Sequence, residues 1–388
     1  MLIGVPREIK THEYRVGLTP ESVRQLVGDG QRVLIERDAG IGIGAGDADY
    51  RAAGAVIASG AGEIFATADL IVKVKEPLAS ERGQLRRGQT LFTYLHLAPD
   101  RAQALDLLRS GVTAIAYETV TADGGGLPLL APMSEVAGRM ASQVAAHFLE
   151  RPSGGRGILM SGATGVKPAR VLVLGAGVVG SNAAAIALGM GADVTIMNPS
   201  GDIFPRLIAA LGSRLKTRVI DASALDEELR VADAVIGAAL APGALAPKLI
   251  TRAMLQNMKP GTVLVDVSID QGGCFETSHS TTHADPVYLI DGVLHYCVAN
   301  MPGAVPHTST YALNQATFPF VRRLAGRGII AALRDDPHLL NGLNVCAGVI
   351  TRPEVAVALG MPCVDALNAL SLIGPPVLGN SIGSPSIH

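Results

Sequence analysis

Four polar residues have types and positions suited to chemistry on a substrate that carries a carboxylate. Arg15 follows the first apolar run of the chain, Lys75 and His96 follow two later runs, and Asp270 follows a fourth. Ligands of open α/β sheets bind outside the carboxyl ends of the strands, so these side chains are candidates for one shared site. Arginine and lysine suit a carboxylate, whereas histidine and aspartate suit proton transfer. Taken alone, each residue could instead be a solvated loop charge, and His96 a hydrogen-bonded core histidine.

The sequence GAGVVG at 175–180 is the strongest local motif. It follows a predicted strand and begins a predicted helix, which is the context of a dinucleotide-binding loop. Gly175 permits the tight turn, Gly177 lets the backbone approach a pyrophosphate at the helix N-terminus, and Gly180 lets the helix pack close to the sheet. The motif predicts a dinucleotide cofactor, NAD or NADP. The alternative is a glycine turn in an α/β unit that binds no ligand.

The residue expected to bind the adenosine ribose departs from this pattern. An acidic side chain at the end of the second strand of such a fold normally accepts hydrogen bonds from the ribose hydroxyls. Here that strand ends in Asn198, whose amide lacks the charge. Three alternatives follow: NAD held with fewer contacts, tolerance of NADP, or a decayed adenosine pocket. Asp193 and Asp202 are nearby acids whose positions fit less well.

Alternating strands and helices are predicted to position these residues. In the first third of the chain, strands are expected at Leu2–Val5, Arg32–Glu36, Leu70–Val74, Thr90–Tyr94 and Val112–Ala116. In the middle third they are expected at Arg170–Leu174, Asp193–Met197, Arg218–Ile220, Ala234–Gly237, Thr262–Val267 and His295–Val298. Helical patterns separate most of these runs. The alternation predicts parallel sheets covered by helices on both faces.

The length of 388 residues predicts two domains. A helix expected at Ser309–Leu324 would return the chain to the first of them. We therefore predict an α/β protein with two Rossmann-like, doubly wound parallel-sheet domains and a cleft between them. The boundaries place a discontinuous catalytic, substrate-binding domain at 1–128 and 307–370, a dinucleotide-binding Rossmann domain at 129–306 and a flexible tail at 371–388.

Composition excludes several classes of protein. Hydrophobic residues make up 48% and charged residues 17%, which excludes a disordered, solvating chain. The formal charge of −2 and the absence of basic stripes argue against a nucleic-acid partner.

The four cysteines lack the spacing of a zinc site or redox pair. The N-terminus does not resemble a signal peptide, and the uncharged stretch at 171–192 fits strand, turn and helix better than a membrane span, so we predict a cytoplasmic protein.

Longer stretches of the sequence resemble the alanine dehydrogenase/nicotinamide nucleotide transhydrogenase family. They cover most of the chain up to about residue 370 and are GVPREIKTHEYRVGLTP at 4–20, VKVKEP at 72–77, LFTYLHLA at 91–98, LLAPMSEVAGR at 129–139, VLGAGVVG at 173–180, VDVSIDQGGCFE at 265–276 and VANMPGAVPHTSTYAL at 298–313. Together these stretches are far more specific than the glycine motif alone.

The resemblance implies reversible, NAD-dependent oxidative deamination of L-alanine to pyruvate and ammonia, in a homohexamer. It implies that Arg15 and Lys75 bind the substrate, that His96 is the acid and base, and that Asp270 works with it. With the glycine motif and the ribose position, the expected cofactor residues are Ser134, Gly175, Gly177, Val178, Val179, Gly180, Asn198, Ala239, Leu240, Val267, Ser268, Ile269, Asp270, Val298, Ala299, Asn300 and Met301.

Departures from the family pattern cluster at the adenosine end. The family has an aspartate at Asn198, a lysine at Ile203, a serine at Ile220 and an arginine at His279. A glutamate and a histidine proposed to bind metal in a relative fall at Arg323 and Arg327, so we predict no metal there.

These departures keep two alternatives open. One is an imine or 2-oxo-acid reductase of the same family that uses NADP or another substrate. The other is a catalytically silent homologue with weakened cofactor binding. Partners are expected to be small molecules and other copies of the chain, with neither nucleic acid nor membrane.

Overall fold

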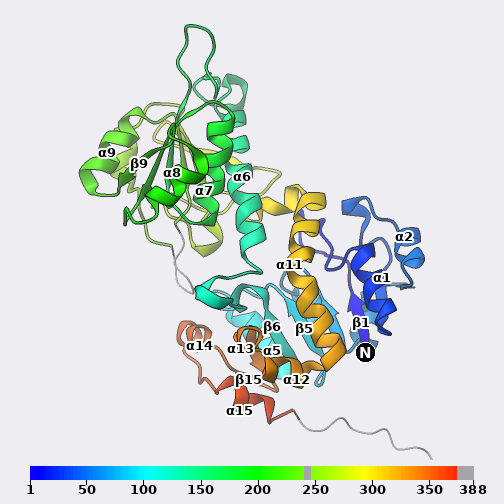
Figure 1. Ribbon diagram of the computed structural model, residues 1–388. Helices are drawn as coiled ribbons and strands as arrows, with labels where there is room; N and C mark the ends of the chain where they lie inside the picture. Colours follow the sequence, from blue (N-terminus) through cyan, green and yellow to red (C-terminus); the bar gives the residue numbers. More distant parts are fainter. Residues whose placement is uncertain (240–245, 374–388) are drawn as a thin grey trace, which may run out of the picture. The chain divides into compact units, whose positions relative to one another are not determined.

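The computed structural model describes residues 1–239 and 246–373, which form two compact units (Figure 1). Unit 1 comprises Met1–Lys10, Val16–Leu127 and the described residues from Thr317 onward. Unit 2 comprises Thr11–Arg15 and Pro128–Ala316. Each unit contains one sheet with helices packed against it, and the predicted α/β class with two Rossmann-like folds is confirmed.

Unit 1 is built on an eight-stranded sheet of order β15-β14-β6-β5-β4-β1-β2-β3. The strands are β1 (Leu2–Val5), β2 (Arg32–Glu36), β3 (Val56–Ala58), β4 (Leu70–Val72), β5 (Thr90–Thr93), β6 (Thr113–Ala116), β14 (Leu343–Cys346) and β15 (Val349–Ile350). The run from β3 to β6 is parallel, whereas β14 and β15 pair antiparallel at the edge. All five strands predicted in the first third are present. The sequence prediction missed the two antiparallel edge strands and the three-residue β3.

Some helices of unit 1 begin at residues whose side chains cap them. Thr19 accepts a hydrogen bond from the Ser22 N–H ahead of α1, and Asp100 does the same for Gln103 at the start of α5. The helices are α1 (Pro20–Gly28), α2 (Asp47–Ala52), α3 (Ala61–Thr67), α4 (Ala79–Arg82), α5 (Arg101–Ser110), α12 (Ile329–Asp335), α13 (Pro337–Leu340), α14 (Pro353–Leu359) and α15 (Ala366–Leu370).

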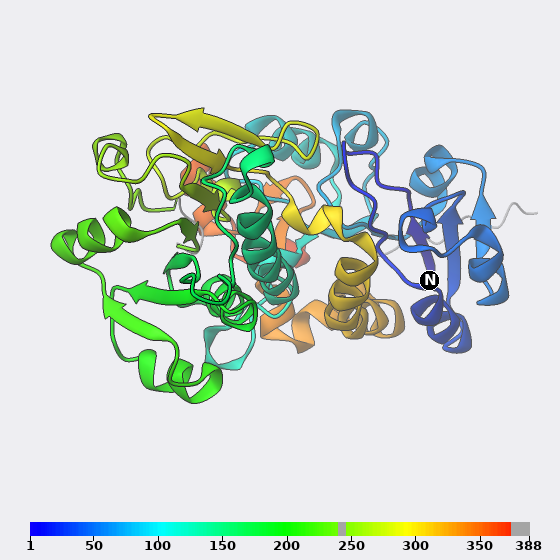
Figure 2. The same cartoon turned by 90° about the horizontal axis from the view of Figure 1, so that it is seen from above.

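Unit 2 is built on a seven-stranded sheet of order β12-β13-β11-β10-β7-β8-β9. The strands are β7 (Arg170–Leu174), β8 (Asp193–Asn198), β9 (Lys216–Val219), β10 (Ala234–Gly237), β11 (Val263–Asp266), β12 (Val287–Ile290) and β13 (Val293–Tyr296). Six strands are parallel, as predicted. The seventh, β12, was missed by the sequence prediction and pairs antiparallel with β13, as the adjacent yellow arrows of Figure 2 show.

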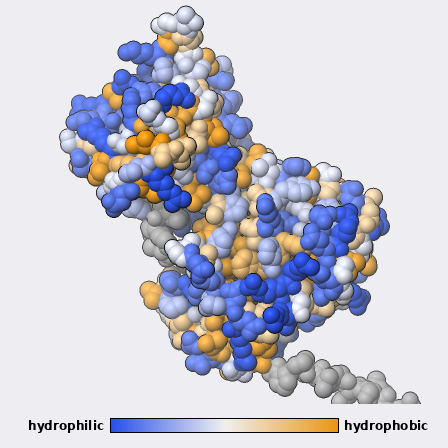
Figure 3. Space-filling model, viewed as in Figure 1, coloured by the Kyte–Doolittle hydropathy of each residue, from blue (hydrophilic) through white to orange (hydrophobic). Residues whose placement is uncertain are grey.

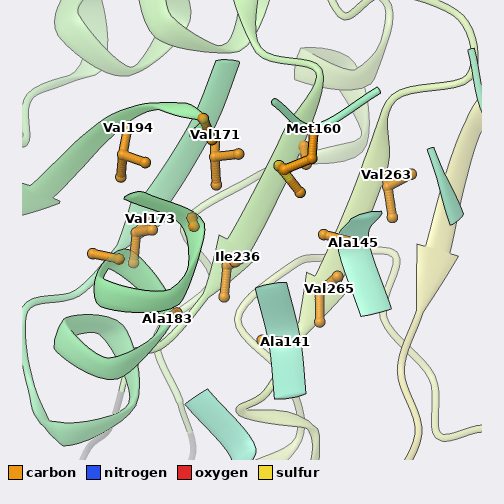
Figure 4. Packing of buried hydrophobic residues seen from close by; sticks show 14 of the residues in the cluster. Ala141, Ala145, Met160, Val171, Val173, Ala183, Val194, Ile236, Val263 and Val265 are labelled. Carbon is orange, nitrogen blue, oxygen red and sulfur yellow. The ribbon is translucent and has the colours of Figure 1, made fainter. Parts of the chain in front are cut away.

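The helices of unit 2 are α6 (Ala131–Phe148), α7 (Val178–Gly189), α8 (Phe204–Leu211), α9 (Ala222–Val231) and α10 (Arg252–Leu255). Alanines of α6 and α7 pack against valines and isoleucines of β7, β8, β10 and β11 in the core shown in Figure 4. Gly138 lets α6 approach α7 closely, because a Cβ atom there would lie 2.3 Å from the Val179 carbonyl oxygen. The small residues of this stretch therefore serve close helix packing.

Helix α11 (Pro306–Arg327) begins in unit 2 and ends in unit 1. It contains the helix predicted at Ser309–Leu324. After α11 the chain contributes β14 to the sheet of unit 1, antiparallel to β6.

No helix within the described ranges is long and apolar enough to cross a membrane. The uncharged stretch at 171–192 forms β7, the glycine loop and most of α7. Figure 3 shows hydrophilic and apolar residues interspersed over the visible face.

Candidate active site

The glycine loop between β7 and α7 has the geometry that its sequence predicts. Gly175 adopts a φ of 107°, and a Cβ atom there would lie 2.6 Å from the Ala238 carbonyl oxygen on the neighbouring strand's loop. A Cβ atom on Gly180 would lie 1.8 Å from the Gly175 carbonyl oxygen. Both positions therefore exclude side chains for packing reasons within the fold.

Gly177 differs from the other two glycines, because the packing of the protein leaves space for a side chain there. A Cβ atom there would meet no protein atom within 4 Å, so packing does not require the glycine. Gly177 is the N-cap of α7, a twelve-residue helix whose first N–H groups have no partners within the helix. Such a helix terminus favours a phosphate, and the missing side chain leaves room for it. The residues present therefore fit a dinucleotide pyrophosphate.

Asn198, at the end of β8, forms hydrogen bonds with the backbone of two loops. Its Oδ1 accepts a hydrogen bond from the Ala176 N–H at 3.2 Å, and its Nδ2 donates to the Ser200 carbonyl oxygen at 2.9 Å. The Ser200 hydroxyl donates to Asp202 at 2.6 Å. The amide thus ties the glycine loop to the turn after β8, and only an amide can make both bonds.

Asp270 lies in η5 (Ile269–Gln271), a short 3-10 helix that follows β11. Asp270 is exposed, whereas Asp266 at the end of β11 is buried and organises the loop. The Asp266 carboxylate accepts hydrogen bonds from the N–H groups of Ser268 at 3.0 Å and Cys274 at 2.9 Å. Burial raises the pKa of Asp266, and these hydrogen bonds counteract the increase.

Arg15 is a buried residue of unit 2 with a defined orientation. Its guanidinium forms two parallel bonds to Glu13, Nε to Oε1 at 2.7 Å and Nη2 to Oε2 at 2.6 Å. Nη2 also donates to Asn300 Oδ1 at 2.7 Å, and Nη1 lies 2.9 Å from the Met133 sulfur. Burial alone would raise the pKa of Glu13, but Arg15 lowers it to about 2. Arg15 is therefore held by a carboxylate that stays ionised.

Lys75 follows β4 in unit 1 and differs sharply from its neighbour Lys73. Lys73 is fully buried and pairs with Glu8 at 3.1 Å and Glu81 at 2.7 Å. Lys75 is also buried, with 7% of its surface exposed, yet its ammonium has no ion-pair partner within the described part of the chain. Glu8 Oε1 accepts hydrogen bonds from the backbone N–H groups of Val74 at 2.6 Å and Lys75 at 3.4 Å. The Lys75 side chain is thus positioned but unpaired.

His96 follows β5, the parallel neighbour of β4, and its backbone is strained. Its φ is 49°, a left-handed conformation that residues other than glycine rarely adopt. Its ring stacks on that of Tyr94 at a centroid distance of 5.7 Å. Thr93 Oγ1 donates to the Lys75 carbonyl oxygen at 2.9 Å, which joins the loops after β4 and β5. Unit 1 therefore brings the loops of Lys75 and His96 together.

The remaining predicted cofactor residues lie in unit 2, except Leu240, which is outside the described residues. Ser134 stands in the first part of α6, and Ala239 accepts a hydrogen bond from the Ser268 hydroxyl at 2.6 Å. Val298 and Met301 are buried in the core of unit 2. Among the predicted cofactor residues, Gly177, Val178 and Asp270 are exposed, and the half-buried ones are Ser134, Gly175, Val179, Asn198, Ala239, Val267, Ser268, Ala299 and Asn300. Ile269 is buried.

Residues that depart from the family pattern have structural partners here. Ile203 and Ile220 pack against the cores of unit 2, and His279 stacks on Tyr288 at 3.7 Å between ring centroids. Arg323 pairs with Asp336, and Arg327 lies 3.8 Å from Asp335. Within 1–239 and 246–373, no group of three or more metal-binding side chains is present.

Sequence reasoning missed the carboxylates that hold the candidate residues. Glu13 holds Arg15, Glu8 holds the Lys75 backbone, and Glu118 holds that of His96. Glu8 and Glu13 both lie in the stretch at 4–20 that carries the family resemblance. Two acids beside a predicted substrate-binding arginine were a usable signal, whereas nothing local in the sequence indicates Glu118.

The doubly wound sheet of unit 2 and its glycine loop define a dinucleotide-binding α/β protein. The chain belongs to the alanine dehydrogenase/PNT family, whose N-terminal domain model matches residues 4–137 and whose C-terminal domain model matches residues 141–353.

Full-length relatives support this assignment. An alanine dehydrogenase of Halomonas elongata is 58% identical over 96% of this chain and 100% of its own, and one of Mycobacterium tuberculosis is 51% identical with the same coverage. A solved L-alanine dehydrogenase structure matches with a TM-score of 0.89 at 48% identity, covering 93% of this chain and 99% of its own. A transhydrogenase from Sinorhizobium meliloti matches with a TM-score of 0.76 at 26% identity, covering 91% and 99%.

Proposed function

We propose that this protein catalyses the reversible, NAD-dependent oxidative deamination of L-alanine to pyruvate and ammonia. One observation carries the proposal: relatives named alanine dehydrogenase are 47–58% identical to the chain over 95–96% of its length. The geometry adds a phosphate-sized opening at Gly177 and a buried, unpaired ammonium at Lys75.

Lys75 and Arg15 are assigned to substrate binding. A buried ammonium without an ion pair gains strongly from an incoming carboxylate or carbonyl oxygen, because its desolvation cost is already met by the fold. Arg15 is oriented by Glu13, and its Nη1 lies 2.9 Å from the sulfur of Met133, a weak acceptor. A substrate oxygen that replaces the sulfur contact would receive a stronger, charge-assisted hydrogen bond.

His96 and Asp270 are assigned to proton transfer. A bound nicotinamide would supply the hydride chemistry, in which Cα of alanine loses a hydride and its nitrogen a proton. The resulting imine then takes up water, and the carbinolamine collapses to pyruvate and ammonia. An imidazole suits these steps because it can both release and accept a proton near neutral pH. Asp270 would assist from the loop that Asp266 organises.

The cofactor is proposed to lie along unit 2, with its pyrophosphate at the N-terminus of α7 and its adenosine ribose near Asn198. NADP is the second candidate, because Asn198 lacks the charge that would repel a 2′-phosphate. Asp202 favours NAD, since its carboxylate lies in the same turn as Asn198.

A direct assay tests the proposal. The protein is mixed with pyruvate and ammonium, and the loss of absorbance is followed with NADH and, separately, NADPH. Turnover with NADH is expected. Turnover only with NADPH, or only with another amine, would indicate the altered reductase. Absence of both turnover and nucleotide binding would indicate a silent homologue.

Assembly and location are proposed from the family alone. We propose a homohexamer that works in the cytoplasm. Light scattering on the purified protein in solution is expected to give a mass six times that of one chain.

A further inference from the structure

The peptide group between Leu95 and His96 is held on both of its sides. The His96 N–H donates to Glu118 Oε1 at 2.7 Å, and the Leu95 carbonyl oxygen accepts from Gln103 Nε2 at 2.6 Å. The preceding Leu95 N–H also points to the Glu118 carboxylate, at 3.2 and 3.3 Å from its two oxygens. The plane of this peptide is thereby fixed in unit 1.

The elements that supply these contacts lie next to β5. Glu118 stands in η2 (Tyr117–Thr119), directly after β6, which pairs with β5 in parallel. Gln103 stands in the first turn of α5, where its N–H is capped by Asp100. Neither residue belongs to the set assigned to substrate, cofactor or proton transfer above.

The conformation that they hold is one that His96 would not adopt on its own. The φ of His96, 49°, lies in the left-handed region, which strains the backbone of a residue that has a Cβ atom. Such strain persists only where surrounding contacts impose it. Two hydrogen bonds to a carboxylate and one from a buried amide can impose this conformation. The strained residue is also the one assigned to proton transfer.

Gln103 carries a second observation. The residue is fully buried, and its Oε1 has no hydrogen-bond partner within the described residues. A buried amide oxygen without a partner is unfavourable and calls for an explanation. The hydrogen bond from Gln103 Nε2 to the Leu95 carbonyl oxygen offers an explanation: the amide is kept at this buried position for its donor, which binds the peptide that precedes His96.

We infer that Glu118 and Gln103 are positioning residues for His96: together they impose its left-handed backbone and so aim its imidazole at the substrate. The inference rests on the proposed role of His96. Glu118 acts through its acceptor oxygens, and Gln103 through its amide donor. The Tyr94 ring, stacked on the imidazole, limits rotation of the side chain once the backbone is set.

The test compares variants of the full-length protein in the alanine assay. Glu118→Ala removes both acceptors, Glu118→Gln keeps one carbonyl acceptor, and Gln103→Met removes the donor at similar volume. Glu63→Ala is the matched control, because Glu63 also accepts a loop N–H of unit 1, from Ser59 at 3.1 Å. Hydrogen–deuterium exchange of the peptide that covers residues 94–97 reports the backbone independently of activity.

We expect Glu118→Ala to lower kcat by about 10- to 100-fold, as a misplaced catalytic group does. Gln103→Met should lower it less, by about fivefold, as loss of one neutral hydrogen bond would. Glu118→Gln should recover most of the activity, Glu63→Ala should change nothing, and the Kd for NADH should stay constant throughout. The amides of Leu95 and His96 should exchange faster in Glu118→Ala.

Several results would overturn the inference. They are a kcat within twofold of the parent for Glu118→Ala, a Glu118→Gln as impaired as Glu118→Ala, or unchanged exchange at residues 94–97. If Glu118→Ala does not fold, Glu118→Gln and Gln103→Met decide by the same exchange and kcat measurements. A His96→Ala variant that keeps its activity would instead refute the proposed role of His96. The exchange measurement would still test whether Glu118 and Gln103 hold the backbone at residues 94–97.

Discussion

The loops at the carboxyl ends of the two sheets are built in opposite ways. In unit 2, the loop after β7 depends on missing side chains, because Gly175 and Gly180 lie where a Cβ atom would collide with backbone. In unit 1, the loops after β4 and β5 depend on added side chains, since Glu8 and Glu118 bind the backbone N–H groups there. One loop is shaped by sterics and the other two by charge-assisted hydrogen bonds.

This difference determines how each region should respond to change. A loop shaped by sterics tolerates changes of pH and salt but no added atoms. Loops held by carboxylates tolerate small changes of shape but depend on every partner of the hydrogen-bond network. Unit 2 contains sites of the second kind as well, where Glu13 holds Arg15 and Asp266 holds the loop after β11.

Loss of Lys73 should have the largest effect on stability. Lys73→Met leaves Glu8 and Glu81 buried without their cation, which typically costs about 3–5 kcal/mol. Burial works to lower the pKa of Lys73, but the two carboxylates raise it above its usual value, so the cation is firmly retained. Chemical denaturation followed by circular dichroism measures the loss. Lys75→Met is the matched control and should lose activity while its free energy of unfolding changes by less than about 1 kcal/mol. Equal destabilisation by both variants would contradict the distinction.

The second largest effect on stability is expected from acid, which should weaken the Glu13–Arg15 ion pair. The folded-state pKa of Glu13, about 2, lies below the ordinary glutamate value of 4.5, so the pair contributes stability above pH 4.5 that is lost as the pH falls towards 2. At about 1.4 kcal/mol per pKa unit, the contribution is about 3 kcal/mol. Denaturant titrations between pH 6 and pH 2 should show this slope in the parent and a smaller one in Glu13→Gln. Parallel pH profiles of the two proteins would refute the assignment.

The two kinds of loop also differ in how far the sequence reveals them. The turn at Gly175 and the close packing at Gly180 were predicted from the sequence, because each of these glycines has a local role that the spacing of the motif encodes. The carboxylates were missed because Glu118 is 22 residues from His96 in the chain and meets it only through the pairing of β5 with β6. Strands β12, β14 and β15 were missed for a related reason, since an antiparallel strand at or next to the edge of a sheet is defined by its partner rather than by its own pattern.

Two glycines of one loop should separate folding from binding. Gly180→Ala places a methyl group 1.8 Å from the Gly175 carbonyl oxygen, and the shift of α7 that relieves it should cost about 1–3 kcal/mol. Gly177→Ala meets no protein atom, so its stability should stay within about 0.5 kcal/mol of the parent. Its Kd for NADH should nevertheless rise about tenfold, because the methyl group enters the space proposed for phosphate. Isothermal titration calorimetry with thermal unfolding checks both. Unchanged NADH affinity in Gly177→Ala would refute the proposed position of the pyrophosphate at the N-terminus of α7.

Asn198→Asp should have the smallest effect and bears directly on the choice of cofactor. Aspartate keeps the acceptor for the Ala176 N–H but cannot donate to the Ser200 carbonyl oxygen, so the turn after β8 should lose about 1 kcal/mol. The new charge can accept hydrogen bonds from ribose hydroxyls more strongly than the amide does, and it repels a 2′-phosphate. Affinity for NADH should rise about fivefold while affinity for NADPH falls, which fluorescence titration of the two nucleotides measures. A parallel loss of affinity for both would mean that the amide serves the glycine loop alone, and that the adenosine ribose binds elsewhere in unit 2.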